Sequence, residues 1–285
     1  MATLGAVIAT VELLSHPARR LVGLPPPGLN ATSVEIGISS GGHIYGWLLP
    51  GKPKGGAVLL LHGVWGDRRE MVDRAKFLVK RGYGVLLIDL PAHGESFGER
   101  ITYGAHEAEG VKAALAFLAQ HQPGERIGVI GVSLGAASLV LAKPSPAPSA
   151  VVLESMFSTI EDAARNRSSV WLGTPGPVLA QLLIEQLAVR LRTSPAQLHP
   201  IEEVAALGCP TLIVSGSADR YTTLDETKRI FDSTSAPKEL WIVEGAAHVD
   251  LHAFAPAVYQ ARVGAFLDKY LRTPVHTSPS GTSRT

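Results

Sequence analysis

The chain has 285 residues, of which 46% are hydrophobic, so it can bury a large core, and mixed α/β proteins of this length often form one domain. Its 26 Lys and Arg residues nearly balance 25 Asp and Glu residues and form no basic block, which argues against nucleic-acid binding. The single cysteine, Cys209, excludes an internal disulfide bond and a cysteine-based metal site.

The N-terminal residues MATLGAVIATVELLSHPARR contain an apolar run that is too short to span a membrane. The run lacks a preceding basic segment and contains Glu12, which argues against a secretion signal. We therefore predict, over residues 1–31, a linker preceded by a helix that packs on the protein or makes weak contact with a membrane interface. A cytoplasmic location is expected, with peripheral membrane association and secretion left open.

Residues 33–51 contain two strand-like runs around a Ser-Ser-Gly-Gly sequence that is typical of a tight turn, so we predict a hairpin. Continuous apolar runs then alternate with helical stretches. The runs are AVLLLHG (57–63), GVLLIDL (84–90), IGVIGVS (127–133), AVVLES (150–155), TLIVSG (211–216) and ELWIVEG (239–245). Such runs are typical of strands buried on both faces, so the order predicts an α/β fold with a mostly parallel sheet between helices.

Residues 156–208 contain helical runs punctuated by Pro and Gly but no convincing strand. An insertion at this point would lie over the carboxyl ends of the strands, so we predict a helical cap, although any single helix could instead pack on the sheet. One run carries an apolar stripe of Leu179, Leu182, Leu183, Leu187 and Leu191. Residues 273–285 are polar and rich in Ser, Thr and Pro, and we predict that they form a disordered tail.

The pattern Gly-x-Ser-x-Gly, which marks a catalytic serine in one large hydrolase class, occurs twice. Ser133, within residues 131–135, ends an apolar run and precedes a helical stretch, which is the setting that an exposed nucleophile requires. Ser39, within residues 37–41, has a strand-like run on both sides. We therefore predict that Ser133 is the nucleophile and that Ser39 is a turn residue.

A serine nucleophile needs a base, and the base needs an acidic partner. His248 follows the last predicted strand and is predicted to be the base, whereas His252 is expected to begin the final helix as a solvated or capping residue. Asp219 follows the penultimate strand and is the predicted acid. Asp225 is expected in the first turn of a helix, and Glu154, which also ends a strand, remains the alternative acid.

Ester cleavage also requires donors for the oxyanion that develops on the carbonyl oxygen. We predict the backbone N–H groups of Leu134 and of Val64, with Trp65 as a further candidate donor. The leucine stripe and Trp171 or Met156 nearby suggest an apolar acyl pocket, which favours short- to medium-chain esters. Trp65, Met156 and Leu183 are the predicted substrate-binding residues. A charged substrate would need a cation in the cap, which four arginines could supply: Arg165, Arg167, Arg190 and Arg192.

Several motifs together resemble the α/β-hydrolase superfamily over residues 32–272: the His62-Gly63 loop, the DLPAHGES segment (89–96), the GVSLG turn and the order Ser, Asp, His. Within it, the short cap is similar to that of small serine esterases and prolyl-oligopeptidase-type hydrolases. The resemblance implies an eight-stranded sheet with the cap after the sixth strand, no cofactor or metal, and ester, thioester or amide substrates. Pro91-Ala92 replace the Arg-Gly common in relatives, and we interpret the adjacent His93 as a buried turn residue.

These residues lead us to expect two-step acyl transfer from a small-molecule carboxylic ester through an acyl-enzyme on Ser133. Three alternatives use the same triad: a peptidase or acyl-peptide hydrolase, a thioesterase, and an acyltransferase. A hydrolase-like binding protein without catalytic activity is the non-enzymatic alternative. The sequence leaves the natural substrate and the oligomeric state open.

Overall fold

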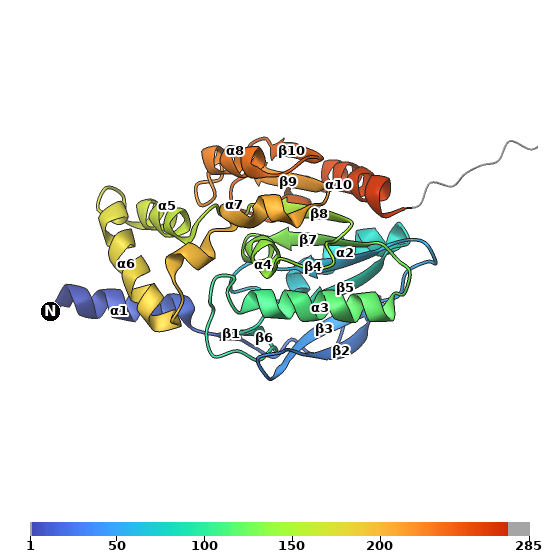
Figure 1. Cartoon of the computed structure of the whole chain (residues 1–285), viewed down its shortest axis with the longest axis horizontal. Helices are drawn as coiled ribbons and strands as arrows, with labels where there is room; N and C mark the ends of the chain where they lie inside the picture. The colour runs from blue at the N-terminus through green and yellow to red at the C-terminus, as the bar shows by residue number, and fades with distance from the viewer. Residues whose placement is uncertain (1, 273–285) are drawn as a thin grey trace, which may run out of the picture.

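The computed structural model describes residues 2–272, and the predicted tail at 273–285 lies outside the described residues. Its centre is an eight-stranded sheet, as expected, in the spatial order β10-β9-β8-β7-β4-β5-β3-β2 (Figure 1). In chain order the strands are β2 (Thr32–Gly37), β3 (His43–Leu49), β4 (Ala57–Leu61), β5 (Gly84–Ile88), β7 (Ile127–Val132), β8 (Ala150–Glu154), β9 (Thr211–Gly216) and β10 (Lys238–Val243). The β2–β3 hairpin pairs antiparallel, as does β3 with β5, and the other pairs are parallel.

Helices cover both faces of the sheet and one of its ends. Their bounds are α1 (Ala2–Ser15), α2 (Val72–Lys80), α3 (Glu107–His121), α4 (Leu134–Ala142), α5 (Ile160–Leu172), α6 (Gly176–Leu191), α7 (Pro200–Glu203), α8 (Leu224–Ser233), α9 (Leu251–Phe254) and α10 (Pro256–Leu271). A short pair of strands, β1 (Ala18–Arg19) and β6 (His93–Gly94), lies outside the main sheet. Among the described residues, no helix has both the length and the apolar character needed to cross a membrane.

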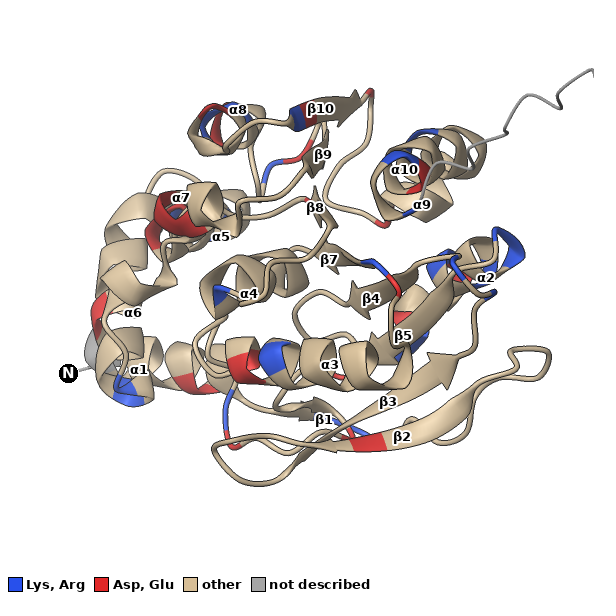
Figure 2. Cartoon of the chain, turned by 45° about the vertical axis from the view of Figure 1, so that its right-hand side comes forward, with Lys and Arg blue, Asp and Glu red and all other residues tan. Residues whose placement is uncertain are grey.

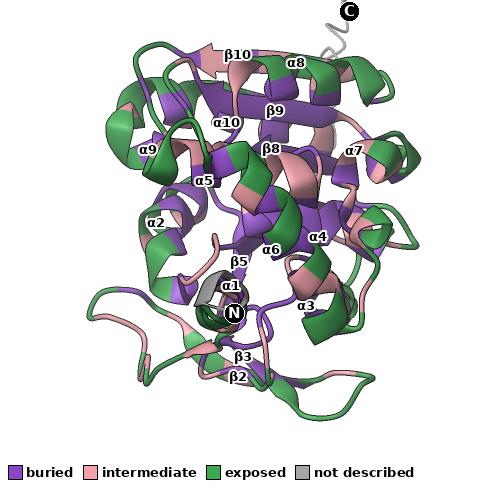
Figure 3. Ribbon diagram, turned by 90° about the vertical axis from the view of Figure 1, so that its left-hand side faces the viewer, coloured by how far each residue is buried: buried purple, intermediate pink, exposed green. Residues whose placement is uncertain are grey.

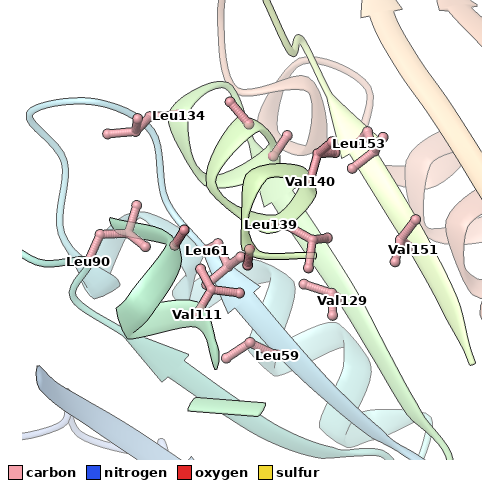
Figure 4. Packing of buried hydrophobic residues seen from close by; sticks show 14 of the residues in the cluster. Leu59, Leu61, Leu90, Val111, Val129, Leu134, Leu139, Val140, Val151 and Leu153 are labelled. Carbon is pink, nitrogen blue, oxygen red and sulfur yellow. The ribbon is translucent and has the colours of Figure 1, made fainter. Parts of the chain in front are cut away.

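Two hydrophobic cores lie on opposite faces of the sheet, because successive residues of a strand point to opposite sides. Leu59 and Leu61 of β4 belong to the core beneath α3 and α4, where Figure 4 shows their side chains near Val111 and Leu139. Val58 and Leu60, also fully buried, belong to the core beneath α2 and α10. Burial on both faces is the reason that the central strands read as continuous apolar runs.

A third hydrophobic cluster joins the N-terminal helix to the cap. The cap helices α5 and α6 follow β8, the sixth strand of the sheet in chain order, as predicted. Val7 and Val11 of α1 pack with Leu183, Ile184 and the following leucines of α6, and Figure 1 shows these two helices side by side. The first helix of the chain therefore packs against an insertion that begins some 145 residues later, which no local sequence pattern predicted.

Charged residues of both signs occur along α2, α3, α8 and α10 (Figure 2), in agreement with the balanced composition. Two buried arginines, Arg68 and Arg74, are each paired with two carboxylates. Arg74 of α2, whose side chain is only 2% exposed, contacts Glu154 at the end of β8 at 2.7 Å and Asp250 at 2.8 Å. Its Nε donates to the Tyr259 oxygen of α10 at 3.1 Å, and the Tyr259 hydroxyl donates to Glu154. Arg74 thus joins two helices, a strand and the loop that precedes α9.

Replacing Arg74 by Met should lower the free energy of unfolding by about 3–5 kcal/mol, because the Glu154 carboxylate would remain buried without its partner. The control is Lys76→Met on the same helix, whose partner Asp73 is exposed, and it should cost less than about 1 kcal/mol. Urea unfolding of both variants measures the difference. Equal losses would contradict a structural role for the buried pair.

Candidate active site

The predicted site residues come together at one edge of the sheet, where parallel strands end. Val64 follows β4, Ser133 follows β7, Asp219 follows β9 and His248 follows β10. The strands β4, β7, β8, β9 and β10 are successive neighbours, so the four loops that carry these residues share the same edge. The end view in Figure 3 shows α5 and α6 in front of this edge.

Ser133 occupies a tight turn between β7 and α4. Its φ of 49° and ψ of −107° are rare for a residue with a side chain. The turn requires both flanking glycines, since a Cβ on Gly131 would lie 2.7 Å from the Ala136 Cα and one on Gly135 would lie 2.6 Å from the Leu61 oxygen. The backbone N–H of Ser133 donates to the Glu154 carbonyl at 2.7 Å, which ties the turn to β8.

The His248 side chain is held by a buried carboxylate. Its Nδ1 lies 2.8 Å from Oδ2 of Asp219, a residue that is 5% exposed. Asp219 also accepts hydrogen bonds from the Tyr221 N–H at 2.8 Å and from the Thr222 N–H and hydroxyl at 2.9 and 2.7 Å. Burial by itself raises the pKa of Asp219, but the hydrogen bonds and the neighbouring imidazole outweigh it and hold the pKa below its usual value. The ionised carboxylate accepts the Nδ1–H, which leaves Nε2 as the proton acceptor.

A cavity of about 380 Å³ opens beside Ser133 and His248, and both residues line it. Val64 and Leu134, the two predicted oxyanion donors, line it as well. Among the described residues, neither of their backbone N–H groups donates a hydrogen bond within the protein. Most of the remaining wall is apolar and comes from the cap, including Ile160, Leu179, Leu183, Ile184 and Leu187.

Of the three predicted substrate-binding residues only Leu183 lines this cavity, whereas Trp171, which the sequence offered as the alternative to Met156, lines it as well. Met156 is 3% exposed and packs in the core beneath α3 and α4, so its predicted position in the pocket was wrong. Trp65 is not part of the lining either, since its ring lies against the guanidinium of Arg167, 5.3 Å from ring centre to Cζ. Both residues adjoin the site in sequence, but adjacency does not determine which way a side chain points.

The sequence reasoning missed the contribution of α1, which supplies Thr10, Val11 and Leu14 to the cavity wall. The spacing of Val7, Val11 and Leu14 by four and three residues is a signal of a helix face that needs a partner. Nothing in that spacing identifies the partner as the cap. The missed residues on the other walls include Tyr103, Phe157 and Tyr221.

The rival candidates have other environments. Ser39 lies in the turn of the β2–β3 hairpin, as predicted. Asp225 lies in the first turn of α8, also as predicted, and Glu154 is the carboxylate paired with Arg74. His252 was expected to be solvated or capping, which was wrong: it is 6% exposed and packs between Phe77 and Tyr259.

His62 braces the loop that carries Val64, and its ring centre lies 5.2 Å from that of His93. His62 donates through Nδ1 to the Gly63 carbonyl at 2.7 Å and accepts the Leu90 N–H through Nε2 at 3.0 Å. Complete burial, with a smaller contribution from His93, lowers the pKa of His62 to about 3, so this ring stays neutral. His93 is fully buried in its turn, as predicted, and contacts the Pro91 carbonyl at 2.9 Å.

A sequence model of the alpha/beta hydrolase family matches residues 58–261 of the chain, well over half of its length. The chain belongs to the alpha/beta hydrolase family. The match begins in β4 and ends in α10, so it includes every strand that carries a candidate site residue as well as the cap. This hydrolase thus has the fold that the motifs predicted.

Related sequences and structures extend the comparison. The hydrolase is 28% identical to an uncharacterized protein of Mycobacterium tuberculosis over 245 residues, which cover 81% of this chain and 80% of the relative. It is 23% identical to an uncharacterized protein of Bacillus subtilis, with 74% and 70% covered. Among solved structures, the Pyrococcus furiosus esterase Pf2001 matches with a TM-score of 0.75 at 23% identity, covering 90% of this chain and 98% of that one. An esterase from Exiguobacterium antarcticum matches with a TM-score of 0.61 at 16% identity, covering 83% and 100%.

Replacing Gly135 by Ala should destabilise the hydrolase by about 1–3 kcal/mol, because the new methyl group would press on the backbone at the end of β4. The control is Gly37→Ala, since a Cβ at Gly37 has its nearest neighbour at 3.9 Å, an ordinary contact. Urea unfolding compares the two variants. Agreement of the two unfolding free energies within about 0.5 kcal/mol would contradict the close approach of α4 to β4.

Proposed function

We propose that this hydrolase cleaves carboxylic esters of small molecules through an acyl-enzyme on Ser133. The observation that carries the proposal is that Ser133 and His248 line one cavity while His248 is hydrogen-bonded to the buried Asp219. A serine at a strained strand–helix turn, an imidazole with a fixed tautomer and a buried carboxylate are the three groups that serine acyl transfer needs.

In the proposed reaction the Ser133 oxygen attacks the ester carbonyl while its proton passes to Nε2 of His248. The hydrogen bond from Nδ1 to Asp219 orients the ring and stabilises the imidazolium that forms. His248 then gives the proton to the departing alcohol, which leaves the acyl group on the serine. Water, deprotonated by His248, attacks the acyl-enzyme, and collapse of the second tetrahedral intermediate releases the acid and restores the serine hydroxyl.

The negative charge on the carbonyl oxygen needs donors that are already oriented. The N–H groups of Leu134 and Val64 suit this task, because both residues line the cavity beside Ser133 and neither N–H donates a bond within the described part of the chain. Leu134 is the first residue of α4, so the positive end of the helix dipole adds to the stabilisation. His62 holds the Val64 loop by its two hydrogen bonds.

The cavity favours esters with a short- to medium-chain acyl group. Its volume of about 380 Å³ is in the range of small-molecule pockets, and its wall is mainly aliphatic. The same triad would act on thioesters or amides, so the substrate panel should include an acyl-CoA and an aminoacyl amide beside p-nitrophenyl esters of increasing length. A strict preference for the amide would overturn the ester assignment.

Ser133→Ala should abolish hydrolysis of p-nitrophenyl butyrate and covalent labelling by a fluorophosphonate probe, because the nucleophilic oxygen is gone. The matched control is Ser39→Ala, which removes the serine of the second Gly-x-Ser-x-Gly sequence, in the hairpin turn. This control should keep wild-type rates and labelling. Wild-type hydrolysis by Ser133→Ala would exclude it as the nucleophile.

Asp219→Asn should lower kcat by about 10⁴-fold, because an amide cannot hold His248 in the tautomer that accepts the serine proton. Asp225→Asn, in the first turn of α8, is the control and should retain wild-type kcat. Steady-state kinetics with p-nitrophenyl butyrate measures both effects. A similar small loss in the two variants would exclude Asp219 as the acid of the triad.

A further inference from the structure

Among the four cap arginines that the sequence singled out, one lines the cavity. Arg165 contacts the carboxylate of Asp162 on its own helix at 2.6 Å, and Arg190 pairs with a glutamate of α1. Arg192 caps the C-terminus of α6, directly after Leu191, and is not part of the cavity wall. Arg167 of α5 lines the cavity with the nucleophile candidate.

The Arg167 guanidinium is surrounded by aromatic rings from three parts of the chain. Its Cζ lies 5.3 Å from the ring centre of Trp65 after β4, 5.7 Å from that of Trp171 in α5 and 4.9 Å from that of Tyr221 after β9. The Trp171 indole N–H also donates to the Tyr221 hydroxyl at 3.3 Å. Aromatic rings attract a cation, but they do not accept strong hydrogen bonds from it as a carboxylate does. The rings therefore hold the guanidinium in place and leave its five N–H donors for another partner.

Arg167 has no anionic partner among residues 2–272. No Asp or Glu oxygen lies within 4.0 Å of its nitrogens, and its side chain donates no hydrogen bond to another described residue. The buried arginines elsewhere differ, since Arg68 and Arg74 each contact two carboxylates. A half-buried arginine held by rings, on the wall of a cavity, therefore has a charge and N–H donors that are available to a ligand.

The charges that line the cavity also favour an anionic ligand. No Asp or Glu is among the described residues that line the cavity, and Arg167 is its only Lys or Arg there. Most of the wall is apolar, so the field of the guanidinium is screened less than it would be in water. An anionic group that enters this cavity meets one cation and no competing carboxylate.

We propose that Arg167 binds a carboxylate of the substrate, so that this hydrolase acts on amphipathic esters with an apolar chain and a free carboxylate at some distance from the scissile bond. The inference rests on the proposed ester hydrolysis at Ser133. A carboxylate is the fitting anion, because its planar pair of oxygens matches the planar fork of the guanidinium. The aliphatic side chains of the cap contact the chain that joins the carboxylate to the ester.

Two matched substrate pairs test the proposal, each with a free carboxylate in one member and its methyl ester in the other. p-Nitrophenyl hydrogen suberate and p-nitrophenyl methyl suberate carry the group on the acyl side. 4-Carboxyphenyl butyrate and its methyl ester carry it on the alcohol side. For the wild type, kcat/KM should be higher for the charged member in at least one pair.

For the Arg167→Met variant, kcat/KM of the free carboxylate divided by kcat/KM of its methyl ester should fall by about 10- to 100-fold in that pair, because a charge-assisted hydrogen bond is lost. Most of the fall should come from a higher KM for the charged ester. Arg165→Met, on the same helix but directed to Asp162, is the control and should leave the ratio at the wild-type value. An equal effect of Arg167→Met on both members of both pairs would overturn the proposal and leave Arg167 as a packing residue.

A binding experiment separates this inference from the proposed reaction. In the Ser133→Ala background, the tryptophans next to Arg167 report binding through their fluorescence during titration with monomethyl suberate or dimethyl suberate. Tighter binding of the charged ligand, lost on adding Arg167→Met, would support the anion site even if ester turnover were absent. Equal binding of the two ligands would overturn the anion site even if Ser133 were the nucleophile.

Discussion

The tight turn between β7 and α4 is the constraint on which the site depends. Ser133 has a positive φ there, and this strained conformation persists because the strand before it and the helix after it fix the backbone on both sides. Gly135 lets the start of α4 approach the end of β4, and that approach brings the first amide of the helix beside the loop that carries Val64. Asp219 follows β9 and His248 follows β10, and because these strands are parallel to β7, both residues lie at the same edge of the sheet as Ser133.

Charges have different roles in the body of the protein and in the cavity. In the body two buried arginines are paired with carboxylates: Arg68 with Asp89 and Glu95, and Arg74 with Glu154 and Asp250. These pairs connect strand ends to helices and loops, and removing one partner would leave the other charge buried and uncompensated. The cavity has one cation held by aromatic rings and no described carboxylate.

The cavity walls and the catalytic edge rest on different packing. The edge depends on the two cores of the sheet, whereas the walls depend on the separate cluster of α1, α5 and α6. Glu12 of α1 pairs with Arg190 of α6 and with Arg100, which adds charge contacts to that cluster. Tyr103 packs against both this cluster and the core beneath α3 and α4, so it joins the cap to the body of the protein.

The sequence by itself determined the strands and the edge on which the candidate triad lies. Burial on both faces produces continuous apolar runs, and in a parallel sheet residues that directly follow such runs must share one edge, so Ser133, Asp219 and His248 were predictable from position. Only the tertiary structure decided the surroundings of that edge. The partner of Glu154 is Arg74, 80 residues away, and α1 docks on the cap. Met156 turns into the core and Arg167 into the cavity. Periodicity shows that a helix has an apolar face, but what covers that face depends on long-range packing, which no local pattern records.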